Sequence, residues 1–586
     1  MTISPTTHRT TSPRTETTTS PADGTTKPGG GTTQQGDRTQ PGNHTTRPSD
    51  RTTPPGPPPS PAPGVRIAGH SVPQAARVLT SDALETVADL HRHFAGRRRE
   101  LLTARTERQE RISAGEDLGL LPHTRAVRED PDWQVAPPAP GLRRRTVEIT
   151  GPVSRSMAIN ALNSGADVWM ADLEDATSPT WSNLMEAQLN LIRFTCDELD
   201  FTNAAGKTYR VGPNPPTVMM RPRGWHLPES NLQIDGEPAV AALVDIGLYF
   251  HHCAQALIDR GQGPYFYLPK LESHTEARLW NEIFIFLQER YGIPRGTVRA
   301  TVLVETLPAA LEMEEILFEL REHSAGLNAG RWDYIFSIIK TLRGRGAQAL
   351  LPDRGQITMT TAFMRAYCER MVALCHKRGA HAIGGMSAFV PSRSDQPAAL
   401  RALQRVRADK ARDAEDGFDG GWVAHPGLVD TARDAFGPAL RGRDHQLERQ
   451  RGDYLDPAEL LDLRTAGGGI THHGLRSNVA VSLRYLTAWL QGQGAVAIDD
   501  LMEDAATVEI ARTQVWQWVT QGARLEEGLP VTAELVERIM ADEAARIAHE
   551  LPGATRLSDA VSLFRDVALG EEFEEFFTLR AYAHYL

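Results

Sequence analysis

Two carboxylates, Glu305 and Asp333, stand at the edges of short apolar runs and are candidate ligands for a hard metal ion. Glu305 closes the run TVLVE, and Asp333 opens the run DYIFS. Oxygen ligands that are few in number and leave room for water and substrate suit Mg²⁺ better than Zn²⁺. Capping a helix or pairing with an arginine is the structural alternative for each residue, and the spacing alone does not decide.

Arg221 is the candidate group for holding negative charge. It closes the run TVMMR, and Arg223 follows two places on. A guanidinium stays charged at physiological pH and offers a planar fork of donors, so it can bind a carboxylate or a developing oxyanion. An ion pair with Asp172 or Glu174, near the end of the run DVWMAD, is the alternative. Arg221 can form such an ion pair and bind an anion at the same time.

The segment LMEDAATVEI carries two adjacent carboxylates, Glu503 and Asp504, on an expected helix. Adjacent residues on a helix diverge by about 100°, so only one of the two faces a given site. A partly buried carboxylate there can act as a general base. Paired acids at the start of a helix also interact favourably with the helix dipole, which is the simpler role.

The elements that must position these side chains form an alternating pattern. Short apolar runs typical of β-strands alternate with amphipathic segments such as 309–322 and 360–377. Eight such units predict an α/β fold, a (β/α)8 TIM barrel, with functional groups at the carboxyl ends of its strands. Most candidate residues lie at such ends, and Asp333 is the exception. The runs cover residues 146–150, 167–172, 217–221, 265–269, 301–305, 333–337, 381–385 and 422–425.

The regions outside the barrel differ from it in composition and in hydrophobic pattern. The N-terminal segment is dominated by Thr, Pro, Gly, Ser and Arg, and we expect disorder because it buries too little apolar surface to offset the entropy of ordering. A helix near 81–114, capped by Ser81 or Asp82, begins the folded part. The predicted boundaries are 1–66 for a disordered tail, 67–145 for an N-terminal helical region, 146–440 for the barrel and 441–586 for a C-terminal helical domain that carries Asp504.

Composition excludes several classes of function. The chain of 586 residues is 40% hydrophobic and 23% charged, which is typical of a soluble globular protein. A net charge of -11 argues against a nucleic-acid partner, because phosphate neutralisation needs a basic surface. The four cysteines do not fit a disulfide framework or a paired zinc site. Without a long apolar run, an apolar leader or a Ser-Lys-Leu ending, we expect no membrane partner and a cytoplasmic location.

The run REHSAGLNAGRWDYIF at 321–336 resembles the signature of the malate synthase family. The resemblance covers roughly residues 71–586, and the compact barrel is similar to the shorter form of that family. Further similar segments are EITGPV (148–153), MADLEDA (170–176), RPRGWHLPE (221–229), GPYFYLPKLES (263–273), LVETLPA (303–309), CHKRGAHAIGGMSAFVPS (375–392), WVAHPGLVD (422–430) and LMEDAAT (501–507).

The resemblance implies a Mg²⁺-dependent acyltransferase of the glyoxylate cycle that condenses acetyl-CoA with glyoxylate to give malate and CoA. It implies that Glu305 and Asp333 bind Mg²⁺ and that Arg221 stabilises the oxyanion. Asp504 matches the catalytic base that takes a proton from the thioester methyl. Because that proton is weakly acidic, the site must be dry, so we expect the helical domain to close over the barrel mouth.

The resemblance also implies roles for residues around these four side chains. Asp172 and Glu174 would orient Arg221 and metal-bound water. Pro391 matches a position that borders CoA. The backbone that would help to hold glyoxylate belongs to Gly330, Arg331, Trp332 and Asp333.

Two other classes of function stay open at this point. A malyl-CoA or citramalyl-CoA lyase shares a magnesium barrel and a carbon–carbon bond beside a CoA thioester, but it lacks the LMEDAAT segment and the GLNAGRWDYIF run. A non-catalytic binding protein built on the same fold should have lost at least one of Glu305, Asp333, Arg221 and Asp504, and all four are present. The sequence does not distinguish a monomer from a homo-oligomer.

Overall fold

The computed structural model describes residues 62–203, 205–391, 395–450 and 456–586. The predicted tail therefore lies mostly outside the described residues. Its expected boundary at residue 66 is too late, because β1 (Val65–Ile67) pairs antiparallel with β7 (Pro228–Ile234). The Val65 side chain is buried in this pairing, and its burial favours an ordered strand in a segment where composition predicted none.

Eight parallel strands close into a barrel, which confirms the predicted TIM fold. Their order around the barrel is β10-β11-β12-β13-β2-β3-β6-β9, so neighbours in space are neighbours along the chain apart from inserted strands. The inserted strands are β7, β4 (Asp200–Thr202), β5 (Thr208–Arg210) and β8 (Glu237–Val240). The barrel strands are β2 (Val147–Pro152), β3 (Val168–Asp172), β6 (Thr217–Arg221), β9 (Tyr265–Leu268), β10 (Arg299–Val304), β11 (Ser324–Ala329), β12 (Ala382–Ser387) and β13 (Gly420–Val423).

Seven of the eight predicted strand runs coincide with these strands, and the sixth was wrong. Residues 333–337 belong to the helix α9 (Trp332–Leu342), and the sixth strand is the preceding segment SAGLNA. Glycine and asparagine are poor strand formers, so this segment gave a weak signal, whereas a short window on an apolar helix reads as a strand. Asp333 thus follows the carboxyl end of β11, and the exception in the predicted pattern disappears.

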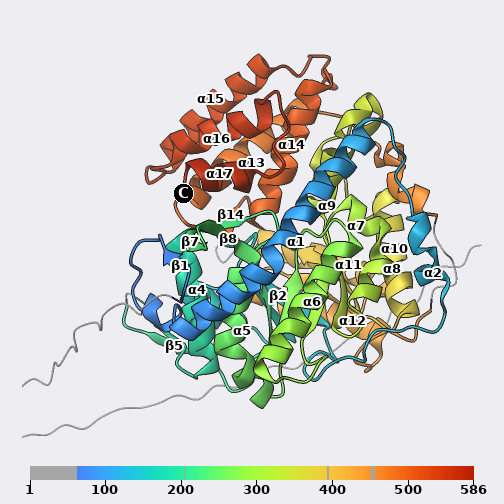
Figure 1. Ribbon diagram of the computed structural model, residues 1–586. Helices are drawn as coiled ribbons and strands as arrows, with labels where there is room; N and C mark the ends of the chain where they lie inside the picture. Colours follow the sequence, from blue (N-terminus) through green and yellow to red (C-terminus); the bar gives the residue numbers. More distant parts are fainter. Residues whose placement is uncertain (1–61, 204, 392–394, 451–455) are drawn as a thin grey trace, which may run out of the picture. The chain divides into compact units, whose positions relative to one another are not determined.

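Helices surround the barrel, as expected for βα units (Figure 1). The predicted helix over 309–322 is divided in two, α7 and α8, whereas the one over 360–377 corresponds to α10. By length and composition α5 is apolar enough to span a membrane, the one such helix among the described residues, but most of it is buried in the fold. The helices are α3 (Arg155–Leu162), α4 (Trp181–Thr195), α5 (Ala241–Asp259), α6 (His274–Tyr291), α7 (Leu307–Leu311), α8 (Met313–Glu319), α10 (Ala362–Lys377), α11 (Gln396–Asp416) and α12 (Val429–Leu440).

One long helix, α1 (Ser81–Ser113), crosses α5 and α6 on the outside of the barrel (Figure 1). Its N-cap is Thr80, whose hydroxyl accepts a hydrogen bond from the Ala83 N–H at 3.3 Å. The expected caps, Ser81 and Asp82, lie inside the helix instead. Thr80 has the extended backbone that an N-cap requires, and the sequence pattern alone left the position of this turn open by one or two residues.

The C-terminal region is helical, as predicted, and has a hydrophobic core of its own that includes Trp489, Trp518 and Phe564. A short hairpin precedes α14 and brings its first turn to the barrel. The elements are α13 (His472–Leu490), β14 (Val496–Ile498), β15 (Leu501–Glu503), α14 (Ala505–Thr520), α15 (Ala533–Glu550), α16 (Leu557–Leu569) and α17 (Phe577–His584).

Short elements complete the described part of the chain. The region 67–145, apart from α1, contains only brief helical turns and irregular backbone, so it is less helical than predicted. Across the whole described chain, the short elements are η1 (Ala75–Arg77), η2 (Pro122–Thr124), α2 (Arg125–Glu129), β4 (Asp200–Thr202), β5 (Thr208–Arg210), β8 (Glu237–Val240), η3 (Arg343–Ala349), η4 (Arg354–Gln356), η5 (Pro426–Leu428), η6 (Pro457–Leu461) and η7 (Leu463–Ala466).

Candidate active site

A cavity of about 990 Å³ opens at the carboxyl ends of the barrel strands, where the C-terminal region meets them. Its lining includes the four side chains to which the sequence assigned chemistry, Arg221, Glu305, Asp333 and Asp504. Three of them come from the barrel, and the fourth is the residue between β15 and α14. The fold therefore brings segments that are far apart in the chain to one concave site, the usual form of a small-molecule site.

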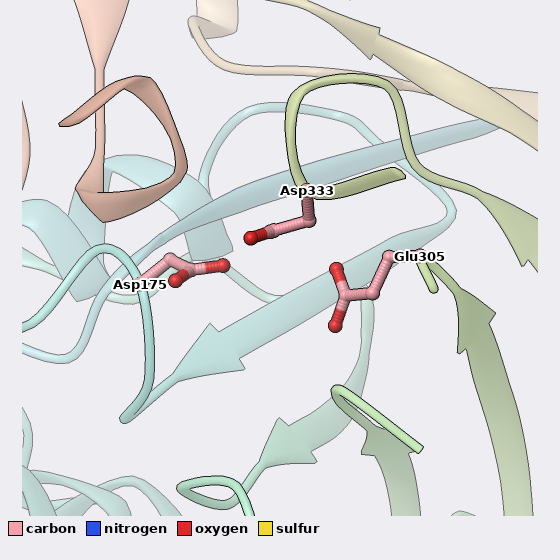
Figure 2. Close-up of side chains that lie close together, drawn as sticks. All are labelled: Asp175, Glu305 and Asp333. Atoms are coloured by element: carbon pink, nitrogen blue, oxygen red, sulfur yellow. The ribbon is translucent and has the colours of Figure 1, made fainter. Parts of the chain in front are cut away.

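Asp175, Glu305 and Asp333 form a cluster of buried carboxylates, each offering an oxygen atom within 4.8 Å of the others. Figure 2 shows the three side chains pointing toward one another. Within the described part of the chain, Asp333 Oδ1 is buried and has no hydrogen-bond partner. Buried polar atoms are normally satisfied, and an oxygen atom in such a cluster suits a hard cation. The residues thus fit a divalent metal ion.

Asp175 was missed by the sequence reasoning, which named its neighbours Asp172 and Glu174. The signal was present, because MADLEDA contains three acids, one that ends the strand β3 and two that follow it. The loop is folded around Asp172, whose carboxylate accepts hydrogen bonds from the N–H groups of Glu174 at 2.9 Å and Ala176 at 2.8 Å. This turn places the Asp175 carboxylate in the cluster.

Arg221 is held by the carboxylates of that loop. Its Nε donates to Asp172 Oδ1 at 2.6 Å, and its Nη1 lies 3.3 Å from Asp175 and 3.4 Å from Glu174. Burial favours the neutral arginine, but the charges of Asp172, Glu174 and Asp175 outweigh it and raise the pKa well above its usual value. The ion pair with Asp172, which the sequence offered as an alternative role for Arg221, is therefore present. It holds in place a charged guanidinium that also lines the cavity.

Arg223 takes no part in this cluster, because the strand ends at Arg221. Its guanidinium binds Asp245 at 2.7 Å and Glu229 at 2.8 Å in a separate buried network. A strand that continued through Arg223 would place its side chain on the same side as that of Arg221, but β6 ends at Arg221.

Lys270, after the strand β9, is a second basic residue of the site that the sequence reasoning did not single out. Its Nζ lies 2.9 Å from Glu174, 3.0 Å from Asp175 and 3.2 Å from Asp333. Its backbone N–H donates to Glu305 Oε1 at 2.7 Å. The lysine in the run YFYLPKLES was visible, but a lone lysine after a strand is common and gave no reason to choose it.

Asp504 is the residue immediately before α14, not a residue within a helix as predicted, and Glu503 ends β15. The Asp504 side chain does not cap the helix, whereas the Glu503 carboxylate accepts a hydrogen bond from the Thr507 hydroxyl. The first turn of α14 is hydrogen-bonded to the loop that contributes Asp175 to the carboxylate cluster, because the Ala505 N–H donates to the carbonyl of Asp175 at 3.2 Å. The Asp504 carboxylate is thus left to face the cavity.

The environment of Asp504 disfavours its charged form. Burial, followed by the negative charge of Asp175, raises the pKa of Asp504 from 3.8 to about 8. A carboxyl whose pKa is higher in the folded protein than in the unfolded chain binds its proton more tightly when folded. Its contribution to the free energy of unfolding therefore falls as the pH rises from 3.8 toward 8.

We expect Asp504→Asn to raise the melting temperature of the protein without ligands at pH 8 by a few degrees, because the amide carries no charge to desolvate. At a pH of about 5 the gain should be much smaller, since Asp504 is then protonated in the folded protein. Thermal unfolding at both pH values measures this difference. Asp500→Asn, in the exposed turn of the same hairpin, is the control; an equal effect of Asp504→Asn at both pH values would contradict the prediction.

The loop before α9 provides backbone donors beside the carboxylate cluster. Gly330 lies close to Glu305, since an added Cβ would stand 2.8 Å from the Glu305 Cβ. Its N–H already donates to the Tyr367 hydroxyl at 3.1 Å, so it is engaged within the protein. The N–H groups of Trp332 and Asp333 open the helix, where such groups lack partners within the helix and attract anions.

Arg331 and Pro391 differ in their relation to the cavity. The Arg331 guanidinium lines it and stacks 3.7 Å from the centre of the Trp332 ring. Burial lowers the pKa of Arg331 to about 10. Pro391 lies outside the lining, beside Gly427 of the short helix η5 that follows β13. Its predicted position beside CoA stays a prediction.

Comparison with known proteins gives one consistent family. The family model described as "Malate synthase, TIM barrel domain" matches residues 217–463, the model of the malate synthase C-terminal region matches 469–585, and the model of the N-terminal domain matches 63–126. A malate synthase from Streptomyces clavuligerus is 54% identical over 88% of this chain and 97% of that protein. One from Myxococcus xanthus is 51% identical over 90% and 97%, and malate synthase A from Escherichia coli is 44% identical over 87% and 96%.

Proposed function

The chain belongs to the malate synthase family of acyltransferases, and from this premise we propose that its cavity joins the acetyl group of acetyl-CoA to glyoxylate. The products are malate and free CoA. One observation carries the proposal: a carboxylate cluster suited to a metal ion, a fixed guanidinium and a carboxylate of raised pKa line a single cavity. These are the groups that enolisation of a thioester and attack on an aldehyde require.

The metal site of this proposal is the carboxylate cluster. Glu305 and Asp333 would hold Mg²⁺, and Asp175 is a third group in reach of the ion. When bound, the ion supplies Lewis-acid polarisation of the glyoxylate aldehyde. The carboxylate of glyoxylate would lie at the first turn of α9, against the N–H groups of Trp332 and Asp333.

Proton removal and charge stabilisation fall to separate parts of the fold. Asp504, deprotonated, takes a proton from the methyl group of acetyl-CoA, and the enolate oxygen is stabilised by Arg221. The enolate carbon then attacks the aldehyde carbon of glyoxylate and forms the new carbon–carbon bond. The aldehyde oxygen receives the electron pair of the broken C=O π bond and is protonated to the hydroxyl of malyl-CoA, which balances the proton removed by Asp504. Water cleaves the thioester of the resulting malyl-CoA, and CoA leaves as the thiol. Asp172 holds Arg221 in position throughout.

Incubation of the protein with acetyl-CoA, glyoxylate and Mg²⁺ tests this proposal. Free thiol and malate should appear together in equal amounts, and both should depend on all three components. Accumulation of malyl-CoA without free thiol would favour the lyase alternative instead. Absence of any turnover would favour the non-catalytic alternative.

Glu305→Gln should weaken Mg²⁺ binding by about 100-fold or more, because even residues that only orient metal ligands contribute 10- to 100-fold. The amide can still accept the hydrogen bond from the Lys270 N–H, so the loop keeps its support. Isothermal titration with Mg²⁺ measures the change. Glu322→Gln, at a partly exposed ion pair with Arg295, is the matched control, and equal Mg²⁺ affinity in both variants would rule out Glu305 as a ligand.

A further inference from the structure

One buried lysine touches every member of the carboxylate cluster. The Lys270 ammonium forms ion pairs with Asp175 and Asp333, and its backbone N–H donates to Glu305. The distance from the ammonium to Glu305 Oε1 is 4.0 Å. Only 4% of this side chain is exposed, so water contributes little to the solvation of its charge.

Negative charge exceeds positive charge around this lysine. Arg221 is committed to Asp172, which accepts two hydrogen bonds from it. Among the described residues, Lys270 is the only positive side chain paired with Glu305 or Asp333. Carboxylates packed this closely repel one another strongly in a medium of low polarity. Five carboxylates share these two cations: Asp172, Glu174, Asp175, Glu305 and Asp333.

Lys270 contacts the cluster without lining the large cavity. Two small pockets of about 20 and 10 Å³ are lined by Lys270 together with carboxylates of the cluster, whereas Lys270 is absent from the lining of the large cavity. It pairs with Asp333 Oδ2, whereas Asp333 Oδ1 has no partner in the described part of the chain. The ammonium therefore neutralises the carboxylates and leaves an oxygen atom open for a ligand.

The backbone of Lys270 supports a special role for its position. Its φ is 53°, in the left-handed region that residues with a Cβ rarely adopt. Such strain persists where the surrounding contacts fix it, and it gathers at functional sites. Here it allows one residue to offer both its amide and its ammonium to the same cluster.

We propose that Lys270 stands in for the metal ion, so that its ammonium neutralises Asp175, Asp333 and Glu305 when no ion is bound and opposes the ion when it binds. This inference rests on the proposed Mg²⁺ site. Without the lysine charge, the folded protein depends on Mg²⁺ for its stability, and Mg²⁺ meets less repulsion. A lysine that served only to hold the ligands in place would have the opposite effect, because its loss would weaken Mg²⁺ binding.

Thermal unfolding and calorimetric titration of Lys270→Met and Lys270→Arg, without and with saturating Mg²⁺, test the proposal. We expect Lys270→Met to melt about 5 °C or more below the wild type without Mg²⁺, because it loses a buried ion pair. Saturating Mg²⁺ should remove most of this difference, and the Kd for Mg²⁺ should be about tenfold lower than in the wild type. Lys270→Arg keeps the charge and should resemble the wild type in both measurements.

The possible results separate this inference from the proposed metal site. Folding of Lys270→Met only in the presence of Mg²⁺ would support the inference in its strongest form. Weaker Mg²⁺ binding, an unchanged Mg²⁺-induced shift, or failure to fold even with Mg²⁺ would overturn it. The variant Asp333→Asn tests the site itself. If the wild type does not bind Mg²⁺, or if Asp333→Asn binds it as tightly as the wild type does, the metal site and the inference both fail.

Discussion

Asp504→Asn will lower kcat by roughly 10³- to 10⁴-fold, while Mg²⁺ and glyoxylate bind as in the wild type. The amide has almost the shape of the carboxylate but cannot accept a proton from the acetyl methyl group. The side chain does not cap α14 and lines the cavity, so the change removes a reactive group without removing a structural contact of the helix.

Steady-state assay of thiol release, together with titration calorimetry for Mg²⁺ and glyoxylate, measures both parts of this prediction. Asp500→Asn makes the same chemical change in the exposed turn of the β14–β15 hairpin and should leave kcat within about twofold of the wild type. Near-normal turnover by Asp504→Asn would show that another group removes the proton.

Arg221→Lys will lower kcat by roughly 10²- to 10³-fold, the usual effect of removing a donor to an oxyanion. The guanidinium binds Asp172 with one edge and also faces the cavity, and an ammonium group cannot do both. Because the positive charge remains, the fold and the affinity for Mg²⁺ should change little.

Arg223→Lys is the matched comparison, since Arg223 lies two residues away in a buried network that does not line the cavity. It should lower the melting temperature more than it lowers kcat. The test compares the loss of kcat with the loss of stability in each variant. If this ratio were the same for Arg221→Lys and Arg223→Lys, the effect of Arg221 would be structural, and its assignment to the oxyanion would be wrong.

The sequence predicted the barrel because hydrophobic periodicity is a local signal, and it failed where that signal was weak. The strand β11 contains Gly326 and Asn328, and its neighbour α9 presents a dense apolar face. A short window therefore assigned the strand to residues 333–337. The error also displaced Asp333 to the wrong end of a strand, although the residue itself was chosen correctly as a candidate.

The residues that the sequence did not single out depend on tertiary geometry. Which acid of MADLEDA joins the cluster follows from the turn built around the Asp172 carboxylate. Lys270 has a left-handed backbone where it meets the cluster, a conformation that the residue type does not predict. The contact of Ala505 with Asp175 joins segments remote in sequence, and no periodicity in either segment indicates it.

The central claim is that the metal and oxyanion chemistry lie in the barrel and that the base comes from the segment before α14. A crystal structure with Mg²⁺, glyoxylate and an unreactive acetyl-CoA analogue tests it most directly. We predict oxygen atoms of Glu305 and Asp333 about 2.0–2.1 Å from Mg²⁺. We predict a carboxylate oxygen of Asp504 about 3–3.5 Å from the carbon atom that replaces the acetyl methyl. An ion bound away from these carboxylates, or an acetyl group that points away from Asp504, would contradict the claim.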